Sequence, residues 1–148
     1  MHGEPRLRDM ACFALYSASR AVTGYYRPLL DRLGLTYPQL LVLMALWEED
    51  GRSVSALGEA LYLDSGTLSP MIKRLETAGL VERRRESDDE RRVTVHLTEA
   101  GSALEGEGCA IPLTIADASN LSVEELFALR DKLNELTDSL HGRTETTT

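Results

Sequence analysis

Residues 53–79, SVSALGEALYLDSGTLSPMIKRLETAG, decide the fold of this chain. Their apolar spacing predicts a short helix over about 55–61 and a second helix that runs to Ala78. Between the two helices lies a tight turn, in which Asp64 or Ser65 can cap the second helix. Two short helices joined by a few residues, with polar side chains at the start of the second, are typical of a helix-turn-helix.

Residues 80–97 add two predicted strands to this motif. The sequence LVERRR is followed by the charged break ESDDE and then by RRVTVHL, in which valine and leucine alternate with Thr94 and His96. A period of two predicts strands, so we expect a β-hairpin, the wing of a winged helix-turn-helix. Thr98 is then placed to cap another helix.

Two helices are predicted before this motif. The first runs from about Arg8 to the stop at Gly34, and Pro28 is expected to kink its last turns. The second begins after Thr36, which can form a capping box with Gln39. Because the second helix is apolar nearly all round, we expect it to be the central buried helix.

Two further helices are predicted after the wing. The first, residues 98–118, contains three glycines and a proline, so we expect it to be kinked or held by packing. The second begins with a capping box of Ser122 and Glu125 and repeats leucine at helical spacing as far as Leu140. Residues 142–148 are predicted to be a flexible tail.

The predicted fold class is mainly α with a small β-hairpin. We expect a single chain, 1–148, in which residues 37–97 form a winged helix-turn-helix lobe and residues 5–34 and 98–141 form dimerisation helices. The terminal helices carry more apolar surface than a small winged domain needs, which favours pairing with a second chain. A monomeric helical cap is the alternative.

The composition is that of one globular domain, with 148 residues of which 43% are hydrophobic and 27% charged. No apolar run approaches the length of a membrane span, and no apolar signal segment follows the first residues, so we expect a cytoplasmic protein without a membrane partner. Cys12 and Cys109 are too few for a disulfide framework and lack the spacing of zinc ligands. No metal or other cofactor is therefore expected.

The net charge of −8 argues against non-specific binding to nucleic acid by the chain as a whole. Between residues 73 and 92 there are seven basic and six acidic residues, which leaves a net charge of only +1. DNA binding must therefore rest on the arrangement of these side chains rather than on gross charge.

Several short stretches resemble one family of transcriptional regulators. Asp89–Glu90–Arg91, followed by LTEAG at residues 97–101, is similar to the D-x-R and L-T-x-x-G wing motif of the MarR family. The stretches CFALY at 12–16, LTYPQL at 35–40 and LDSGTLSPM at 63–71 resemble the branch of organic hydroperoxide resistance repressors. The resemblance covers nearly the whole chain, and it implies a homodimeric repressor that binds a pseudo-palindromic DNA operator.

The same resemblance implies a redox signal. It makes Cys12 the sensor of an organic hydroperoxide, with Tyr26 and Tyr37 of the partner subunit as hydrogen-bond donors to its sulfur and Tyr16 one helical turn away. By similarity to members with two cysteines, Cys109 would then form an intersubunit disulfide with the oxidised Cys12, unless a small thiol does so. The reduced dimer would bind DNA, and oxidation would release it.

The residues themselves are compatible with this chemistry. A thiolate reacts with peroxides, and in an apolar pocket it needs donors such as tyrosine hydroxyls. Cys12 and Tyr16 share a helix face, whereas Tyr26 and Tyr37 lie too far along to reach Cys12 within one straight helix. The alternatives are that Cys12 is a small packing residue, in a repressor that senses an aromatic ligand, or that the chain is a thiol peroxidase. No CxxC pair, His–Cys arrangement or phosphate loop supports an enzyme.

The candidate DNA contacts lie on the second helix of the motif and on the wing. Short polar residues at the helix N-terminus suit phosphates and base edges, and the cations that follow suit phosphates. Arg91 is expected to enter a minor groove by family resemblance, with Asp89 orienting it. The bland alternative is that the hydroxyls only cap the helix and that the hairpin is a solvated charged surface. The predicted contacts are Ser65, Gly66, Thr67, Ser69, Lys73, Arg74, Arg84, Asp89 and Arg91.

Overall fold

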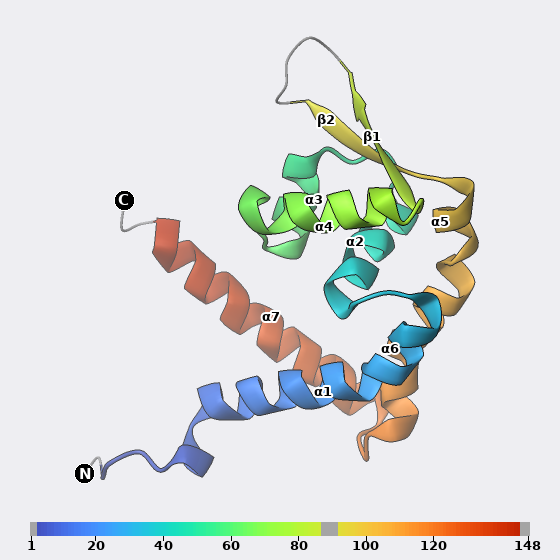
Figure 1. Ribbon diagram of the computed structural model, residues 1–148. Coiled ribbons are helices and arrows are strands. Elements are labelled where there is room, and N and C mark those ends of the chain that lie inside the picture. Colours follow the sequence, from blue (N-terminus) through green and yellow to red (C-terminus); the bar gives the residue numbers. More distant parts are fainter. Residues whose placement is uncertain (1–2, 87–91, 146–148) are drawn as a thin grey trace. The chain divides into compact units, whose positions relative to one another are not determined.

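The computed structural model describes residues 3–86 and 92–145, and the side chains up to residue 143. Helices dominate, and one antiparallel hairpin completes the fold, as predicted (Figure 1). The elements in chain order are η1 (Leu7–Asp9), α1 (Ala11–Leu33), α2 (Tyr37–Glu48), α3 (Val54–Leu61), α4 (Ser65–Thr77), β1 (Val81–Arg85), β2 (Val93–Leu97), α5 (Glu99–Ala103), α6 (Glu105–Ala118) and α7 (Val123–Glu145).

Helix α1 begins later than the sequence predicted. Instead of starting near Arg8, the chain forms the short 3-10 turn η1, and the extended residue Met10 separates this turn from α1. Gly34 ends the helix in the left-handed conformation, with φ 68°. Met10 makes no side-chain cap, so the first backbone N–H groups of α1 lack the partner that a capping side chain would supply.

Helix α2 is the centre of the core, as its sequence predicted. Thr36 and Gln39 form the predicted capping box, with the Gln39 N–H donating to Thr36 Oγ1 at 3.3 Å and the Thr36 N–H donating to Gln39 Oε1 at 3.0 Å. The side chains of Leu40, Val42, Leu43 and Leu46 are fully buried. Helices α1, α3, α4 and strand β2 all contact α2, so one apolar helix organises the lobe.

The helix-turn-helix is formed by α3 and α4. Its turn is tight, because a Cβ atom on Gly58 would lie only 2.7 Å from the carbonyl oxygen of Leu63. Tyr62, between the helices, has a φ of 55°, a conformation that non-glycine residues rarely adopt. On α4 the buried residues Leu68, Ile72 and Leu75 recur at helical spacing, which leaves the opposite face exposed.

Pro70 lies inside α4, six residues into the helix, and does not mark its start or its end. A proline at this position has no N–H to donate to the carbonyl of Gly66 four residues earlier. That carbonyl lies in the first turn of the helix, next to the exposed N-terminal residues.

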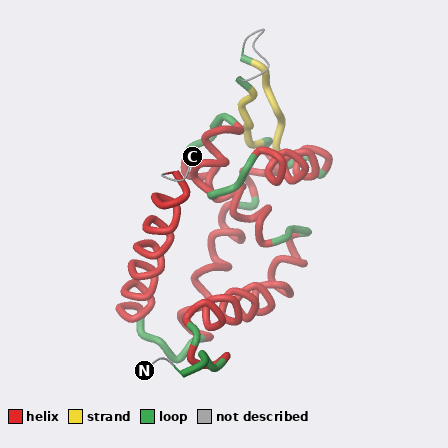
Figure 2. Tube along the Cα trace, turned by 90° about the vertical axis from the view of Figure 1, so that its left-hand side faces the viewer, coloured by secondary structure: helices red, strands yellow, loops and turns green. Residues whose placement is uncertain are grey.

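The wing consists of β1 and β2 in antiparallel register, from Val81 opposite Leu97 to Arg85 opposite Val93. Its base is attached to the segment between α2 and α3. The Val95 N–H donates to the Arg52 carbonyl at 2.9 Å, and the Leu97 N–H donates to Asp50 Oδ1 at 2.8 Å. The hairpin projects from the helices in both ribbon and tube views (Figures 1 and 2).

The segment after the wing is broken rather than merely kinked. Thr98 caps α5 by accepting from the Gly101 N–H at 3.1 Å, and Leu104 separates α5 from α6. The chain divides into two compact units within α6, residues 1–111 and 112–148.

The second unit contains the remainder of α6 and the long helix α7. The predicted capping box is present, since the Ser122 N–H donates to Glu125 Oε2 at 2.7 Å and the Glu125 N–H donates to Ser122 Oγ at 3.1 Å. The predicted flexible tail starts too early, because α7 includes residues 142–145; residues 146–148 lie outside the described part. Large apolar side chains on this unit are exposed in the single chain, among them Leu113, Phe127, Leu129, Leu136 and Leu140.

Within the described residues, no single helix is long and apolar enough to cross a membrane. Helices α1 and α2 would satisfy such a criterion by length and composition only when taken together, and they are bent by 70° relative to each other.

Replacing Gly58 by Ala tests the tight turn. The added methyl group would meet the Leu63 carbonyl, so we expect the free energy of unfolding to fall by about 1–3 kcal/mol. Urea unfolding followed by circular dichroism, at one fixed protein concentration, measures the change. Gly106→Ala is the matched control, because a Cβ atom there has no neighbour within 4 Å. Equal effects of the two substitutions would contradict the close approach at Gly58.

Candidate DNA-binding surface and thiol site

The N-terminus of α4 presents small polar residues to solvent. Ser65, Gly66, Thr67 and Ser69 are all exposed, whereas the intervening Leu68 is fully buried. All four therefore lie on the side of α4 that faces away from the core, where a phosphate or a base edge can approach the polar start of the helix.

Asp64 acts as the cap of this helix. Its Oδ1 accepts from the Thr67 N–H at 2.7 Å, and the backbone and side chain of Thr67 together lower the pKa of Asp64. The carboxylate thus stays charged at the positive end of α4, which stabilises the start of the helix. The Thr67 hydroxyl also contributes to this cap.

The basic residues of this surface differ in their partners. Lys73 and Arg74 are exposed on α4, beyond the polar N-terminal residues. Arg83 on β1 is bound to Glu76 of α4: its backbone N–H donates to Oε2 at 3.0 Å and its guanidinium donates to Oε1 at 3.0 Å. Arg83 therefore fastens the wing to α4.

Arg84, the predicted DNA contact on β1, pairs with Glu82 two residues earlier on the same strand, and its Nε donates to Glu82 Oε1 at 2.6 Å. Both side chains remain at least half exposed, with relative exposures of 57% for Arg84 and 50% for Glu82. The pair is open to solvent, so a phosphate could compete with the glutamate for Arg84.

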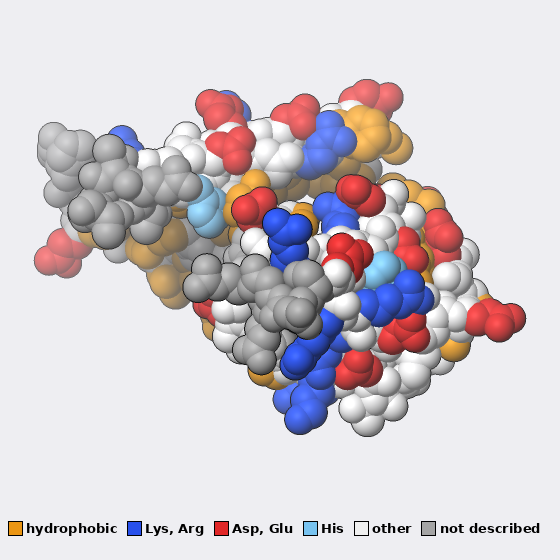
Figure 3. Space-filling model, turned by 90° about the horizontal axis from the view of Figure 1, so that it is seen from above, with side chains coloured by type: hydrophobic (Ala, Val, Ile, Leu, Met, Phe, Trp, Pro, Cys, Tyr) orange, Lys and Arg blue, Asp and Glu red, His pale blue; other side chains and the backbone are white. Residues whose placement is uncertain are grey.

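Two predicted wing contacts, Asp89 and Arg91, lie outside the described residues. Seen from the end of the molecule that bears the hairpin, Lys and Arg side chains lie close to Asp and Glu side chains (Figure 3). The surface is therefore mixed in charge, which agrees with the low net charge of residues 73–92.

Cys12 is exposed and lies in the first turn of α1. One turn on, Tyr16 is 60% exposed, and Arg20 donates from Nη1 to its hydroxyl at 3.4 Å while its guanidinium lies 5.5 Å from the ring centroid. Cys12, Tyr16 and Arg20 therefore follow one another at intervals of four residues along one face of α1.

Tyr26 and Tyr37 are brought together by the packing of α1 against α2. Their ring centroids are 5.4 Å apart, and Tyr26 is buried, with only 4% of its surface exposed. Burial, together with the neighbouring Tyr37 and Tyr25, raises the pKa of Tyr26, and burial also raises the pKa of Tyr37. Both hydroxyls therefore keep their protons at neutral pH and can donate hydrogen bonds.

Cys12 does not join this pair within one chain. Fourteen residues separate Cys12 from Tyr26 in the continuous helix α1, which corresponds to about 21 Å at 1.5 Å per residue. Tyr26 and Tyr37 thus lie together, and the Cys12 of the same chain lies far from them.

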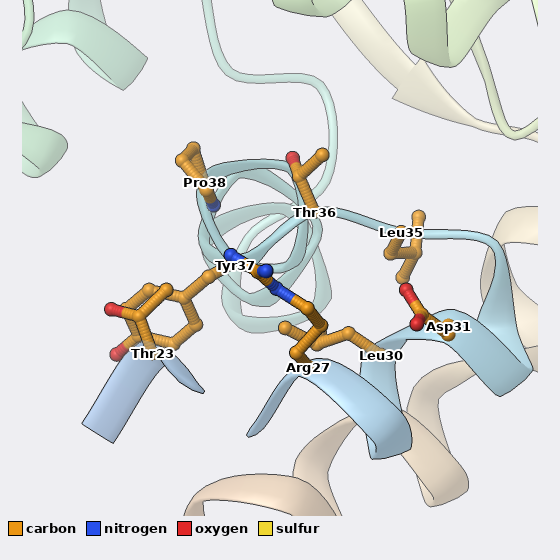
Figure 4. A pocket seen from close by; sticks show the side chains of 8 residues that line it. All are labelled: Thr23, Arg27, Leu30, Asp31, Leu35, Thr36, Tyr37 and Pro38. Atoms are coloured by element: carbon orange, nitrogen blue, oxygen red, sulfur yellow. The ribbon is translucent and has the colours of Figure 1, made fainter. Parts of the chain in front are cut away.

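A hollow of about 200 Å³ lies beside Tyr37, where α1 meets the start of α2. Arg27 extends from α1 toward the first turn of α2 (Figure 4). The hollow combines apolar walls with hydroxyl and charged groups, and its lining residues are Thr23, Arg27, Leu30, Asp31, Leu35, Thr36, Tyr37 and Pro38.

Cys109 is half-buried on α6. Burial raises the pKa of its thiol, and the negative charges of Glu105 and Glu48 raise it further. Cys109 is therefore protonated at neutral pH. Within the described residues, no three His, Cys, Asp or Glu side chains lie close enough together to hold a metal ion.

The comparisons with known proteins agree with this architecture. Residues 24–105 match the family described as transcriptional regulator SarA/Rot. The chain is 48% identical, over 138 residues, to the organic hydroperoxide resistance transcriptional regulator of Bacillus subtilis, a match that covers 93% of this chain and 94% of the relative. This chain belongs to the SarA/Rot/MarR-type family of winged-helix transcriptional regulators.

Solved structures of this winged-helix family are similar in fold. The structure of reduced AbfR bound to DNA superposes on this chain with a TM-score of 0.78 at 34% identity, over 93% of this chain and 94% of that chain. The AbfR of Staphylococcus epidermidis superposes with a TM-score of 0.75 at 31% identity, over 93% and 95% of the two chains. A disulfide-formed AbfR superposes with a TM-score of 0.63 at 36% identity, over 89% and 93% of the two chains. The known relatives and neighbours are regulators, so this winged-helix chain is a regulator and not an enzyme.

Sequence reasoning missed two features of this winged-helix regulator. The first is the pairing of Arg83 with Glu76, which joins residues seven apart on different elements. The only signal for it in the sequence is that Arg83 and Arg84, as neighbours on a strand, must point to opposite faces. The hollow beside Tyr37 was also missed, although Thr23, Arg27 and Asp31 recur every four residues on α1.

Replacing Glu76 by Gln tests the attachment of the wing. The backbone N–H and guanidinium of Arg83 lower the pKa of Glu76 below its ordinary 4.5, so the contact stabilises the fold above that value and the contribution is lost as pH falls through the lowered pKa. Since the two side chains are 40% and 35% exposed, we expect Glu76→Gln to cost less than about 1 kcal/mol at neutral pH.

Urea unfolding at a series of pH values between about 7 and 3 measures this effect. The parent and the variant should converge in acid. Glu59→Gln, at an exposed glutamate of α3, is the control and should show no such convergence. A constant difference between parent and Glu76→Gln at all pH values would contradict the ionic contact.

Proposed function

We propose that this chain is a homodimeric repressor that binds double-stranded operator DNA and releases it when an organic hydroperoxide oxidises Cys12. The observation that carries the redox part is the pair of Tyr26, which is buried, and Tyr37, which is half-buried; both are protonated, and their rings lie 5.4 Å apart, beyond the reach of Cys12 in the same chain. A second chain that supplies its own Cys12 to this pair would complete the site.

DNA binding is supported by the exposed face of α4 and by the wing. Ser65, Gly66, Thr67 and Ser69 would meet phosphates and base edges in a major groove, with Lys73 and Arg74 on phosphates further along. Arg84 would exchange Glu82 for a phosphate, and the family resemblance assigns Arg91 to a minor groove, with Asp89 as its partner. The solved structure of reduced AbfR on DNA supports the same use of this fold.

Dimerisation is supported by the apolar side chains that a single chain leaves exposed. Helix α7 presents Phe127, Leu129, Leu136 and Leu140 with relative exposures of 41–58%. Leu129, Leu136 and Leu140, at intervals of seven and four residues, share one face of α7, and an exposed apolar face of this kind is typically covered by association. A dimer would place two copies of α4 on the two halves of a pseudo-palindromic operator.

The proposed chemistry needs only the thiolate and the peroxide. The Cys12 thiolate attacks the outer oxygen of the hydroperoxide ROOH, the O–O bond breaks, and after proton uptake the products are a sulfenic acid at Cys12 and the alcohol ROH. The hydroxyls of Tyr26 and Tyr37 from the partner subunit would stabilise the sulfur anion, and Tyr16 would line the approach from the same face of α1.

Cys109 can then follow in either of two ways. Its thiol can condense with the Cys12 sulfenic acid to give an intersubunit disulfide and water. Because burial, Glu105 and Glu48 all raise the pKa of Cys109, its thiolate is scarce at neutral pH, which slows this step and leaves time for a small thiol to react at Cys12 instead. The disulfide-formed structure of AbfR supports the first route.

The hollow beside Tyr37 supports a second candidate signal. Its mixture of apolar walls with Thr23, Arg27 and Thr36 could hold a small aromatic ligand, in which case Cys12 would be a structural residue. Its volume of about 200 Å³ lies below that of most ligand pockets, which favours the reading in which a second chain completes a redox site.

A gel-shift experiment on a pseudo-palindromic promoter fragment tests the proposal. We expect the parent dimer to release the fragment on addition of cumene hydroperoxide and Cys12→Ser to remain bound. The combined variant Tyr26→Phe, Tyr37→Phe should bind DNA normally but need at least about tenfold more peroxide, because two hydrogen bonds to a charged sulfur are lost.

Tyr25→Phe is the matched control, since Tyr25 is 42% exposed and borders the same pair with a ring-centroid distance of 5.8 Å to Tyr26. It should respond like the parent. Release of Cys12→Ser by the peroxide would refute the sensor role, and release of Cys12→Ser by an aromatic acid would favour the second candidate.

A further inference from the structure

Trp47, the single tryptophan of the chain, joins the core helix α2 to the helices that follow the wing. Its Nε1–H donates to the carbonyl of Gly101 in α5 at 3.0 Å. The far edge of its indole ring lies against Gly108 in α6, where a Cβ atom would be only 2.4 Å from Cη2 and 2.8 Å from Cζ3. The ring thus contacts both sides of the break at Leu104.

The two glycines are required by close approach, not by backbone angles. A Cβ atom on Gly108 would also lie 3.2 Å from a methyl group of Leu40, which is fully buried. A Cβ atom on Gly101 would lie 2.1 Å from the carbonyl oxygen of Leu80, just before β1. Both positions are buried. The segment from α5 into α6 is therefore seated on the lobe at two points where no side chain fits.

We propose that Trp47 is a positioning residue for operator binding: its contact with Gly101 and Gly108 fixes the direction in which α6 leaves the winged lobe. This inference rests on the dimer proposed above. In such a dimer, the angle between lobe and dimerisation helices sets the distance between the two copies of α4, and hence the spacing of the DNA half-sites that can be bound together.

The physical reason is that packed contacts are discrete. Interiors have no free volume into which a methyl group can be inserted, so a side chain at position 108 must displace either the indole ring or α6. Half-sites are read about one helical turn apart, and a change in lobe orientation misaligns one copy of α4 with its groove while leaving the other in place. Operator binding should therefore respond to this contact far more than binding to one half-site does.

The experiment uses full-length protein and a duplex that the parent protein selects from random DNA. Three further duplexes carry one base pair inserted at the centre, one base pair deleted, or one half-site scrambled. Affinities are measured by fluorescence anisotropy of labelled DNA for the parent, Gly108→Ala, Trp47→Phe and the double variant Trp47→Phe, Gly108→Ala. Sedimentation confirms the dimer, circular dichroism confirms folding, and the emission of Trp47 reports its surroundings in the parent and in Gly108→Ala.

We expect Gly108→Ala to shift the Trp47 emission, to lose about tenfold in affinity for the selected duplex, and to change its preferred spacing. Affinity for the duplex with one scrambled half-site should change by less than about twofold. The double variant should recover part of the loss, because the phenyl ring is shorter than the indole ring and leaves room for the added methyl group. Gly106→Ala, two residues earlier on α6 with no neighbour within 4 Å of its Cβ atom, should bind like the parent.

Three results would overturn the inference. The first is a folded, dimeric Gly108→Ala protein that binds every duplex like the parent. The second is an equal loss of affinity on the full and the scrambled duplexes, and the third is a double variant that shows no recovery. If Gly108→Ala does not fold, Trp47→Phe alone decides: a loss confined to the full duplex supports the inference, and unchanged affinity and spacing overturn it. A monomeric parent would refute the proposed dimer, a failure distinct from any loss in the variants.

Discussion

The length of α1 is the constraint on which the redox part of this account depends. One rigid helix carries Cys12 in its first turn and Tyr26 fourteen residues later, so the two cannot meet within a chain. At the same time the packing of α1 on α2 brings Tyr26 and Tyr37 to 5.4 Å and keeps both hydroxyls protonated. In the proposed site, the donor pair of one chain therefore serves the thiol of another, and a dimer with two-fold symmetry would supply both.

The DNA-binding lobe is held together by a different set of contacts. Helix α2 fills the core, Glu76 ties the wing to α4 through Arg83, and Asp50 receives the N–H of Leu97 at the base of the wing. These contacts hold the polar N-terminus of α4 and the strands β1 and β2 within one compact unit. In the proposed mechanism, oxidation of Cys12 would change DNA affinity by moving this lobe, which is why the contacts of Trp47 matter to the proposal.

The sequence predicted this fold well where local signals are strong. Capping boxes at Thr36 and Ser122 and the alternation before Leu97 marked two helix starts and one strand correctly. It missed the short turn η1, which replaces the expected first turn of α1, and the break after α5. The break at Leu104 adjoins Gly101, whose carbonyl is used by Trp47 from α2. Such long-range contacts leave no periodic signal.

The site shows the same division. Residue types and family resemblance identified Tyr26 and Tyr37, and the structure brings these two together as packing on α2 requires. The pairing of Arg84 with Glu82 was not predicted. Residues two apart point to the same face only when the segment is a strand, so the pairing depends on the strand that the structure shows. The position of Cys12 relative to the tyrosines of a second chain depends on how two chains pack together. The spacing of residues within one sequence does not determine that packing.

A mixed dimer tests the central claim most directly. One chain carries Cys12→Ser, the other carries Tyr26→Phe with Tyr37→Phe, and differently tagged copies are purified together. The one remaining Cys12 then belongs to the phenylalanine-bearing chain and faces intact tyrosines only if these come from the other subunit. We predict that cumene hydroperoxide converts this cysteine to sulfenic acid, trapped with dimedone, at the parent's rate per site. A rate as slow as that of the homodimer of the tyrosine variant would show that the donors act within one chain and would contradict the account.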